Sequence, residues 1–114
     1  MMKNQVVLIV GGAGFIGSHV NKMMNRKGYQ TVVLDNLSRG HRSAVRYGTF
    51  VEGDLANPAA LTHIFKTYPI QAVMHFAAFT DVGESVQDPA KYYLNNVSHT
   101  LNLLMSMVKH QVKT

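Results

Sequence analysis

The stretch Val6-Val7-Leu8-Ile9-Val10-Gly11-Gly12-Ala13-Gly14-Phe15-Ile16-Gly17-Ser18 decides the fold. Its first five residues are apolar and four of them are β-branched, which is typical of a strand buried on both faces. Glycines follow at positions 11, 14 and 17, and a helical pattern of apolar residues begins at once. Gly11 provides the freedom from Cβ constraints that a sharp turn from a strand into a helix needs.

The spacing of the three glycines predicts a fingerprint for binding a dinucleotide. In this pattern the second glycine lets backbone N–H groups approach a pyrophosphate, and the third lets the helix pack closely on the strand. An acid, Asp35, follows 18 residues after Gly17 at the end of a second apolar strand, as the fingerprint requires. The alternative is an ordinary strand–turn–helix in which the glycines are only flexible.

The composition indicates one globular α/β domain over residues 1–114. Hydrophobic residues make up 46% and charged residues 15%, which argues against a disordered protein. The sequence has no cysteine, no cleavable leader and no apolar run of roughly 20 residues, so we expect a cytoplasmic protein without a membrane partner. The net charge is +5, but only Arg39, Arg42 and Arg46 come close together, so we expect no nucleic-acid partner.

Strand patterns alternate with helical patterns along the chain, which predicts parallel βαβ units. We expect strands over 5–10, 31–34, 49–52 and 71–76, helices over 15–27, 59–67 and 89 to about 110, and a short helix within 41–47. Right-handed crossovers then give the strand order 3-2-1-4. The predicted fold class is therefore α/β, a partial Rossmann (doubly wound) fold with a parallel sheet and flanking helices.

Ligands of such sheets bind beyond the carboxyl ends of the strands, where Asp35 is expected to lie. A carboxylate there accepts hydrogen bonds from the hydroxyls of an adenosine ribose and repels a 2′-phosphate, which favours NAD over NADP. Arg39 leaves NADP open, because an arginine nearby can pair with the additional phosphate. A second interpretation of Asp35 is an acid that caps its own loop.

Asp54 and Leu55 follow the third strand, where an acid can accept a hydrogen bond from an adenine amino group and a leucine can pack on the ring. Asp54 can equally begin an Asx turn. The small residues after Phe76, at the end of the fourth strand, would let a cofactor lie against the backbone. The six histidines have no metal-ligand spacing, so we predict no metal site, and we expect His75 to be a packed strand residue.

The last helix has two apolar faces. The face that we expect to pack on the sheet contains Leu94, Val97, Leu101, Leu104, Met105 and Val108. The other face contains Tyr92, His99, Leu103 and Met107. It either covers another part of the same domain or pairs with a second copy of the chain. A fourth strand without a neighbour on its outer edge would also invite self-association.

The chain resembles the amino-terminal part of the UDP-glucose 4-epimerases, a family of extended short-chain dehydrogenases/reductases. The resemblance rests on the glycine stretch 11–17 and on Asp35-Asn36, Gly53-Asp54-Leu55 and His75-Phe76-Ala77-Ala78. The segments 82–89 and 92–97 are also similar to this family. The similarity extends over essentially all 114 residues.

This resemblance implies a bound NAD and a parent isomerase of galactose metabolism, which interconverts UDP-galactose and UDP-glucose through transient oxidation of the sugar. The resemblance implies that the pyrophosphate is contacted by Gly11, Gly14, Phe15, Ile16 and Gly17, and the adenosine ribose by Asp35, Asn36, Leu37, Ser38, Arg39 and Gly40. It implies contacts with the adenine from Asp54 and Leu55. On the nicotinamide side it implies contacts from Phe76, Ala77, Ala78, Phe79 and Thr80, and it adds Asn95 from the last helix. Thr80 stands where many family members have lysine, so one charged contact is missing.

The family catalyses its reaction with a Ser or Thr and a Tyr-x-x-x-Lys pair, and no tyrosine of this sequence has a lysine four positions later. We therefore expect a Rossmann half-domain that stops before the catalytic segment and the substrate domain. It would bind NAD, contain no catalytic residue and be inactive alone, with a UDP-sugar as partner only in a longer protein. Two alternatives stay open: part of a nucleotide-sugar 4,6-dehydratase or decarboxylase, and a non-enzymatic NAD-binding or interaction module.

Overall fold

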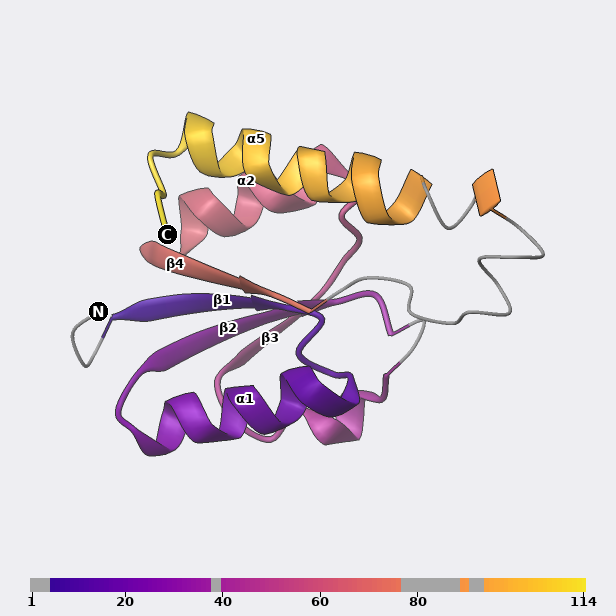
Figure 1. The fold of residues 1–114 in the computed structure, drawn as a ribbon. Helices are drawn as coiled ribbons and strands as arrows, with labels where there is room; N and C mark the ends of the chain where they lie inside the picture. Colours follow the sequence, from indigo (N-terminus) through magenta and orange to yellow (C-terminus); the bar gives the residue numbers. More distant parts are fainter. Residues whose placement is uncertain (1–4, 38–39, 77–88, 91–93) are drawn as a thin grey trace.

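A four-stranded parallel sheet forms the centre of the chain (Figure 1). The computed structural model describes residues 5–37, 40–76, 89–90 and 94–114. The strands are β1 (Val6–Val10), β2 (Gln30–Asp35), β3 (Thr49–Glu52) and β4 (Ile70–His75), and they lie in the order β3-β2-β1-β4. The predicted strand order and the partial Rossmann fold are therefore confirmed.

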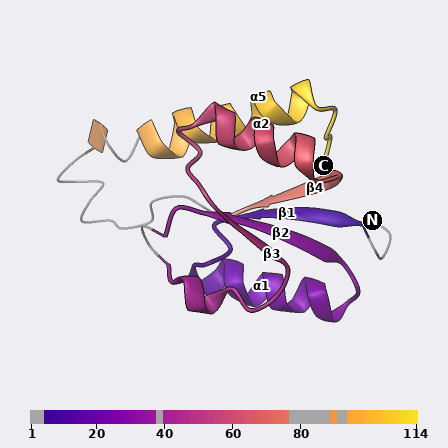
Figure 2. The ribbon, with the colours of Figure 1, turned by 180° about the vertical axis from the view of Figure 1, so that it is seen from behind.

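Helices cover both faces of the sheet (Figure 1 and Figure 2). Helix α1 (Phe15–Arg26) and the 3-10 turn η1 (Arg42–Ala44) lie on one face, and α2 (Pro58–Thr67) and α5 (Thr100–Lys109) lie side by side on the other. The π-helical turn η2 (Leu94–His99) precedes α5. None of the helices in the described ranges is long and apolar enough to cross a membrane.

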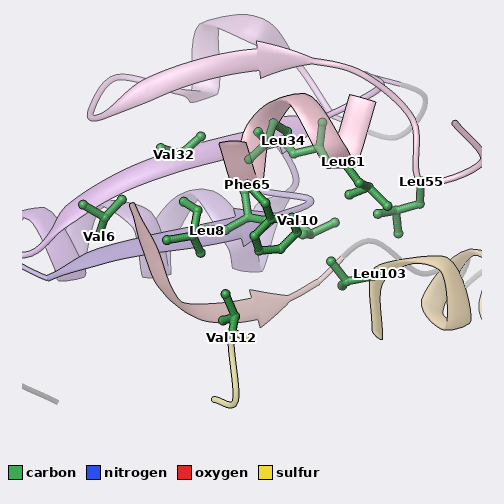
Figure 3. Close-up of a cluster of buried hydrophobic side chains, with 12 residues drawn as sticks. Val6, Leu8, Val10, Val32, Leu34, Leu55, Leu61, Phe65, Leu103 and Val112 are labelled. Atoms are coloured by element: carbon green, nitrogen blue, oxygen red, sulfur yellow. The ribbon is translucent and has the colours of Figure 1, made fainter. Parts of the chain in front are cut away.

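Burial on both faces of β1 explains its continuous apolar sequence. Val6, Leu8 and Val10 belong to a cluster that includes residues of α2 and α5. Val7 and Ile9 belong to a second cluster on the side of α1. Figure 3 shows the first cluster, in which side chains from the sheet meet those of both helices. Because all five residues of β1 are buried, this one strand joins both helical layers to the sheet.

Local signals in the sequence set the helix ends. Gly28 follows α1 with a φ of 94°, the left-handed conformation that commonly ends a helix. Asn57 precedes α2, and its side chain accepts a hydrogen bond from the Ala59 amide at 3.1 Å. Pro58 occupies the first position of α2, where a missing N–H does no harm. The short helix predicted within 41–47 forms only the η1 turn.

The predicted orientation of the last helix is wrong. Leu103 of α5 is 2% exposed and belongs to the core, whereas Leu104 is 50% exposed. The large exposed residues of this region are Val97, Leu101, Leu104, Met105 and Val108, all of them predicted to pack on the sheet. The side chains of Tyr92 and Leu94 lie outside the described residues.

The composition of the two faces of α5 explains this error. The residues predicted to share one face do share it, because Val97, Leu101, Leu104, Met105 and Val108 are all exposed, so only the choice of the buried face was wrong. The buried face of α5 includes Ser106, while several large apolar residues remain outside. Apolar spacing alone therefore selects the exposed face of this helix.

The outer edge of β4 is partly paired by the chain itself. The Val73 amide donates a hydrogen bond to the Thr114 carbonyl at 2.8 Å. Val112, two residues earlier, is buried in the cluster beside α2 and α5. At least one amide of the edge that we predicted to be free therefore has a partner.

We expect Leu103→Ala to lower the free energy of unfolding by roughly 2–5 kcal/mol, because the truncation leaves a cavity in the core. Leu104→Ala is the matched control on the same helix, and it should change this free energy by less than about 0.5 kcal/mol. Urea unfolding of the two variants and the wild type provides the measurement. A larger loss in Leu104→Ala than in Leu103→Ala would show that α5 packs through its other face.

Candidate dinucleotide-binding site

The backbone of the turn from β1 into α1 packs so tightly that it requires glycine. Gly11 has a φ of 84°, a left-handed conformation that residues with a Cβ rarely adopt. Its amide donates to the Leu34 carbonyl at 2.7 Å, and its carbonyl accepts from the Gly14 amide at 3.2 Å. A Cβ on Gly17 would overlap the Gly11 carbonyl oxygen. The first and third glycines of the fingerprint therefore allow the helix to start directly above the strand.

The amino end of α1 is open to a ligand that carries negative charge. Gly14 precedes the helix without a side-chain cap, and the first turn holds no acidic residue. Phe15 and Ile16 are 82% and 63% exposed. The amino end of a helix carries a partial positive charge and N–H groups that lack helical partners. These features fit a pyrophosphate at the predicted place.

Asp35 approaches the glycine turn from the end of β2. Its Oδ2 accepts a hydrogen bond from the Ala13 amide at 2.9 Å, and its Oδ1 accepts one from the Leu37 amide at 2.7 Å. The second bond confirms that Asp35 caps its own loop. Each carboxylate oxygen can accept a further hydrogen bond, so this role is compatible with the predicted contact to ribose hydroxyls.

The loop after β2 folds back over the same turn. The His41 amide donates to the Ala13 carbonyl at 3.2 Å, and Gly40 lies so close that a Cβ would overlap this carbonyl oxygen. Leu37 has a φ of 63°, and its amide is the one held by Asp35. Leu37 and Gly40 thus belong to the loop that lies against the glycine turn, and their contacts with a ribose stay a prediction. Ser38 and Arg39 lie outside the described residues.

The loop between β3 and α2 places Asp54 beside the loop after β2. The Ala56 amide donates to Asp54 Oδ1 at 2.9 Å, which confirms the Asx turn, and Asn36 Nδ2 donates to Oδ2 at 3.2 Å. The Ala56 bond is the largest influence on the pKa of Asp54, and together with Asn36 and the nearby His99 it lowers that pKa against the opposing effect of burial. Leu55 is only 6% exposed, so little of its side chain remains for an adenine ring.

His75 and Phe76 lie at the carboxyl end of β4. The Phe76 amide donates to the Val10 carbonyl at 2.7 Å, and its ring packs against the cluster on the side of α1. His75 Nε2 lies 3.0 Å from Thr100 Oγ1, and burial lowers the pKa of His75. His75 is therefore a packed strand residue, as predicted.

The side chains of the other predicted contact residues lie outside the described part of the chain. Ala77, Ala78, Phe79 and Thr80 lie outside the described residues, and so do residues 82–88 and 92–93 of the two segments that resemble the epimerases. Asn95 belongs to η2 by its backbone, and its side chain lies outside the described part of the chain.

Asn102 contributes a contact that our sequence predictions miss. Its Nδ2 donates a hydrogen bond to the Leu55 carbonyl at 2.9 Å, which joins α5 to the β3–α2 loop across 47 residues of sequence. Asparagine is a poor helix former, so its place within a helical pattern was the available signal. That signal does not indicate which distant carbonyl the side chain reaches.

The described site residues gather where the parallel strands end, as the topology predicts. An uncapped helix end beside a carboxylate can hold a diphosphate with a sugar diol next to it. A groove of about 270 Å³ lies at the opposite, amino-terminal ends of the strands, next to Val6, Tyr29 and Tyr68, and contains none of the predicted cofactor residues. Within the described ranges, no group of three or more His, Asp or Glu side chains could hold a metal ion.

The sequence and the fold of this chain are similar to those of known proteins. The sequence profile of the NAD dependent epimerase/dehydratase family matches residues 7–114. The chain is 48% identical to the UDP-glucose 4-epimerase of Rhizobium meliloti (strain 1021) over 103 residues, which make up 90% of this chain and 31% of the relative. It is 42% identical to a UDP-glucose 4-epimerase of Klebsiella pneumoniae over 115 residues, which cover 94% of this chain and 83% of that relative.

A solved structure shows the same arrangement of elements. The crystal structure of the UDP-glucose 4-epimerase of Brucella ovis in complex with NAD matches this fold with a TM-score of 0.93 and 54% sequence identity. The match covers 96% of this chain and 34% of the Brucella chain. The chain thus spans about a third of the length of the Rhizobium relative and of this solved protein, and 83% of the Klebsiella relative.

Proposed function

The chain belongs to the NAD dependent epimerase/dehydratase family, and on that premise we propose that residues 1–114 bind NAD as the amino-terminal Rossmann half-domain of a UDP-glucose 4-epimerase. The observation that carries this proposal is the Asp35 carboxylate, which is held against the uncapped glycine turn. A carboxylate at this place accepts hydrogen bonds from a ribose diol and repels a 2′-phosphate, which favours NAD over NADP.

The proposed contacts divide the cofactor among the loops at the carboxyl ends of the strands. The pyrophosphate is assigned to Gly11, Gly14, Phe15, Ile16 and Gly17, and the adenosine ribose to the segment 35–40. Asp54 is assigned to the adenine, with at most a marginal contact from Leu55, whose side chain is buried. Phe76 and the segment 77–80 are assigned to the nicotinamide side, together with Asn95.

In the proposed longer enzyme, bound NAD supplies the hydride acceptor for a transient oxidation of the sugar at carbon 4. Residues 1–114 contribute the binding and orientation of the cofactor, and the UDP-sugar becomes a partner only in the longer chain. The proposal includes a cytoplasmic location, with which a sequence free of cysteine is compatible.

We expect Asp35→Ala to weaken NAD binding by about 10- to 100-fold, because hydrogen bonds to a charged group are worth roughly 1.5–3 kcal/mol. Isothermal calorimetry with NAD provides the measurement. Glu52→Gln is the matched control. Glu52 lies on β3 opposite Asp35 of β2, but its side chain is exposed. Thermal unfolding shows whether Asp35→Ala still folds without its bonds to Ala13 and Leu37. Equal affinity of Asp35→Ala and the wild type for NAD would contradict the proposed site.

We expect the 114-residue protein to show no interconversion of UDP-galactose and UDP-glucose, even when it is saturated with NAD. The reason is that these residues contain no Tyr-x-x-x-Lys pair to move the proton of the sugar hydroxyl. Chromatographic separation of the two nucleotide sugars after incubation is the assay. Turnover above that of a buffer blank would overturn this part of the proposal.

Self-association through α5 is also part of the proposal. Val97, Leu101, Leu104, Met105 and Val108 are 45% to 78% exposed and follow one another along η2 and α5. An exposed apolar stripe of this kind is typical of an interface. Leu103 packs in the core, so the stripe replaces the face that we predicted to pair. The bond between Val73 and Thr114 favours this helix over the edge of β4 as the interface.

We expect the wild-type chain to sediment as an oligomer and Leu101→Glu to sediment as a monomer, because a charge in an apolar interface loses its hydration. Met23→Glu on α1 is the control, since Met23 is also about half exposed but lies outside the stripe. Sedimentation velocity over a range of protein concentrations distinguishes the oligomer from the monomer. A wild-type chain that is monomeric at every concentration tested would count against self-association.

A further inference from the structure

Asn102 connects α5 to the loop that carries the proposed adenine contacts. The bond runs from Asn102 Nδ2 to the Leu55 carbonyl oxygen at 2.9 Å, and Asn102 is half-buried. Leu103, the next residue, is fixed in the core at 2% exposure. The Asn102 amide therefore reaches the loop from a helix that is itself held in place.

The loop is also held from the side of β2. The Gly53 amide donates to the Asp35 carbonyl at 3.2 Å, and Asn36 Nδ2 donates to the Asp54 carboxylate. The Leu55 side chain is buried in the cluster beside α2. Asn102 thus completes the support of this loop from the side of α5.

One peptide unit, between Leu55 and Ala56, links Asn102 to Asp54. Its carbonyl accepts the hydrogen bond from Asn102, and its N–H donates to Asp54 Oδ1 at 2.9 Å. A peptide unit is planar, so its C=O and N–H cannot turn independently of each other. The direction in which Asn102 holds the carbonyl therefore sets the direction of the N–H that holds the Asp54 carboxylate.

We propose that Asn102 is a positioning residue for the adenosine half of the cofactor, which acts through the Leu55–Ala56 peptide to hold the Asp54 carboxylate toward the adenine amino group. This inference rests on the proposed NAD site. Without the Asn102 donor, the Leu55 carbonyl loses its partner and the peptide turns to find water. Asp54 then loses the geometry in which it accepts a hydrogen bond from adenine.

The test compares two dinucleotides that differ at the amino group of the adenine ring. Nicotinamide hypoxanthine dinucleotide carries a carbonyl where NAD carries the adenine amino group. A carboxylate accepts a hydrogen bond from the amino group and repels the carbonyl, so the wild type should bind NAD about 10-fold more tightly. The ratio of the two dissociation constants, measured by calorimetry, is the readout.

We expect this ratio to fall below about 3 in Asn102→Leu and in Asn102→Asp, because neither side chain can donate to the Leu55 carbonyl. Asn102→Gln retains an amide donor and should keep most of the preference. Lys109→Ala is the control on the same helix, at an exposed position. A general loosening of the fold would weaken binding of both dinucleotides by the same factor and leave the ratio unchanged.

The outcomes separate this inference from the proposed function. If the wild type binds neither dinucleotide, the proposed function fails and this inference fails with it. If the wild type binds NAD but has no preference, or if Asn102→Leu and Asn102→Asp keep the wild-type preference, only the role of Asn102 is overturned. Thermal unfolding identifies a variant that does not fold, and Asn102→Ser, which is too short to reach the carbonyl, then replaces it.

Discussion

The close approach of Gly17 to the Gly11 carbonyl is the constraint on which the rest of the structure depends. It lets α1 begin directly at the end of β1, with no side chain between the helix and the turn. The amino end of α1 consequently points toward the edge at which β2, β3 and β4 also end. A larger residue at position 17 would push the helix outward and separate the Ala13 amide from Asp35, which it contacts at 2.9 Å.

The polar groups of the candidate site are held by the protein itself. Asp35 and Asp54 each accept hydrogen bonds on both carboxylate oxygens, from Ala13 and Leu37 in one case and from Ala56 and Asn36 in the other. Side chains that are fixed before a ligand arrives lose little conformational freedom on binding. Both acids are therefore oriented by the protein before any ligand binds, and they lie on loops that follow neighbouring strands.

The sequence was sufficient for those features that depend on local chemistry. The glycine spacing, the β-branched run of β1 and the cap at Asn57 each act over a few residues, and the strand order follows from the alternation of strands and helices. The inner face of α5 was predicted wrongly, because the buried face includes Ser106 while the more apolar face is exposed. The bond from Asn102 to Leu55 could not be predicted either, since it depends on how two distant segments pack.

The position of β1 has a consequence for the synthesis of the chain. Val6 pairs with Gln30 of β2 on one side and with Ile70 of β4 on the other, and β1 is made before both of these strands. A chain that leaves the ribosome amino end first can pair one edge of β1 early, but the other edge stays bare until residues 70–75 have emerged. During that interval a fully apolar strand offers unpaired backbone groups to other nascent chains. The speed of translation between β2 and β4 therefore sets how long this edge of β1 stays without its partner strand.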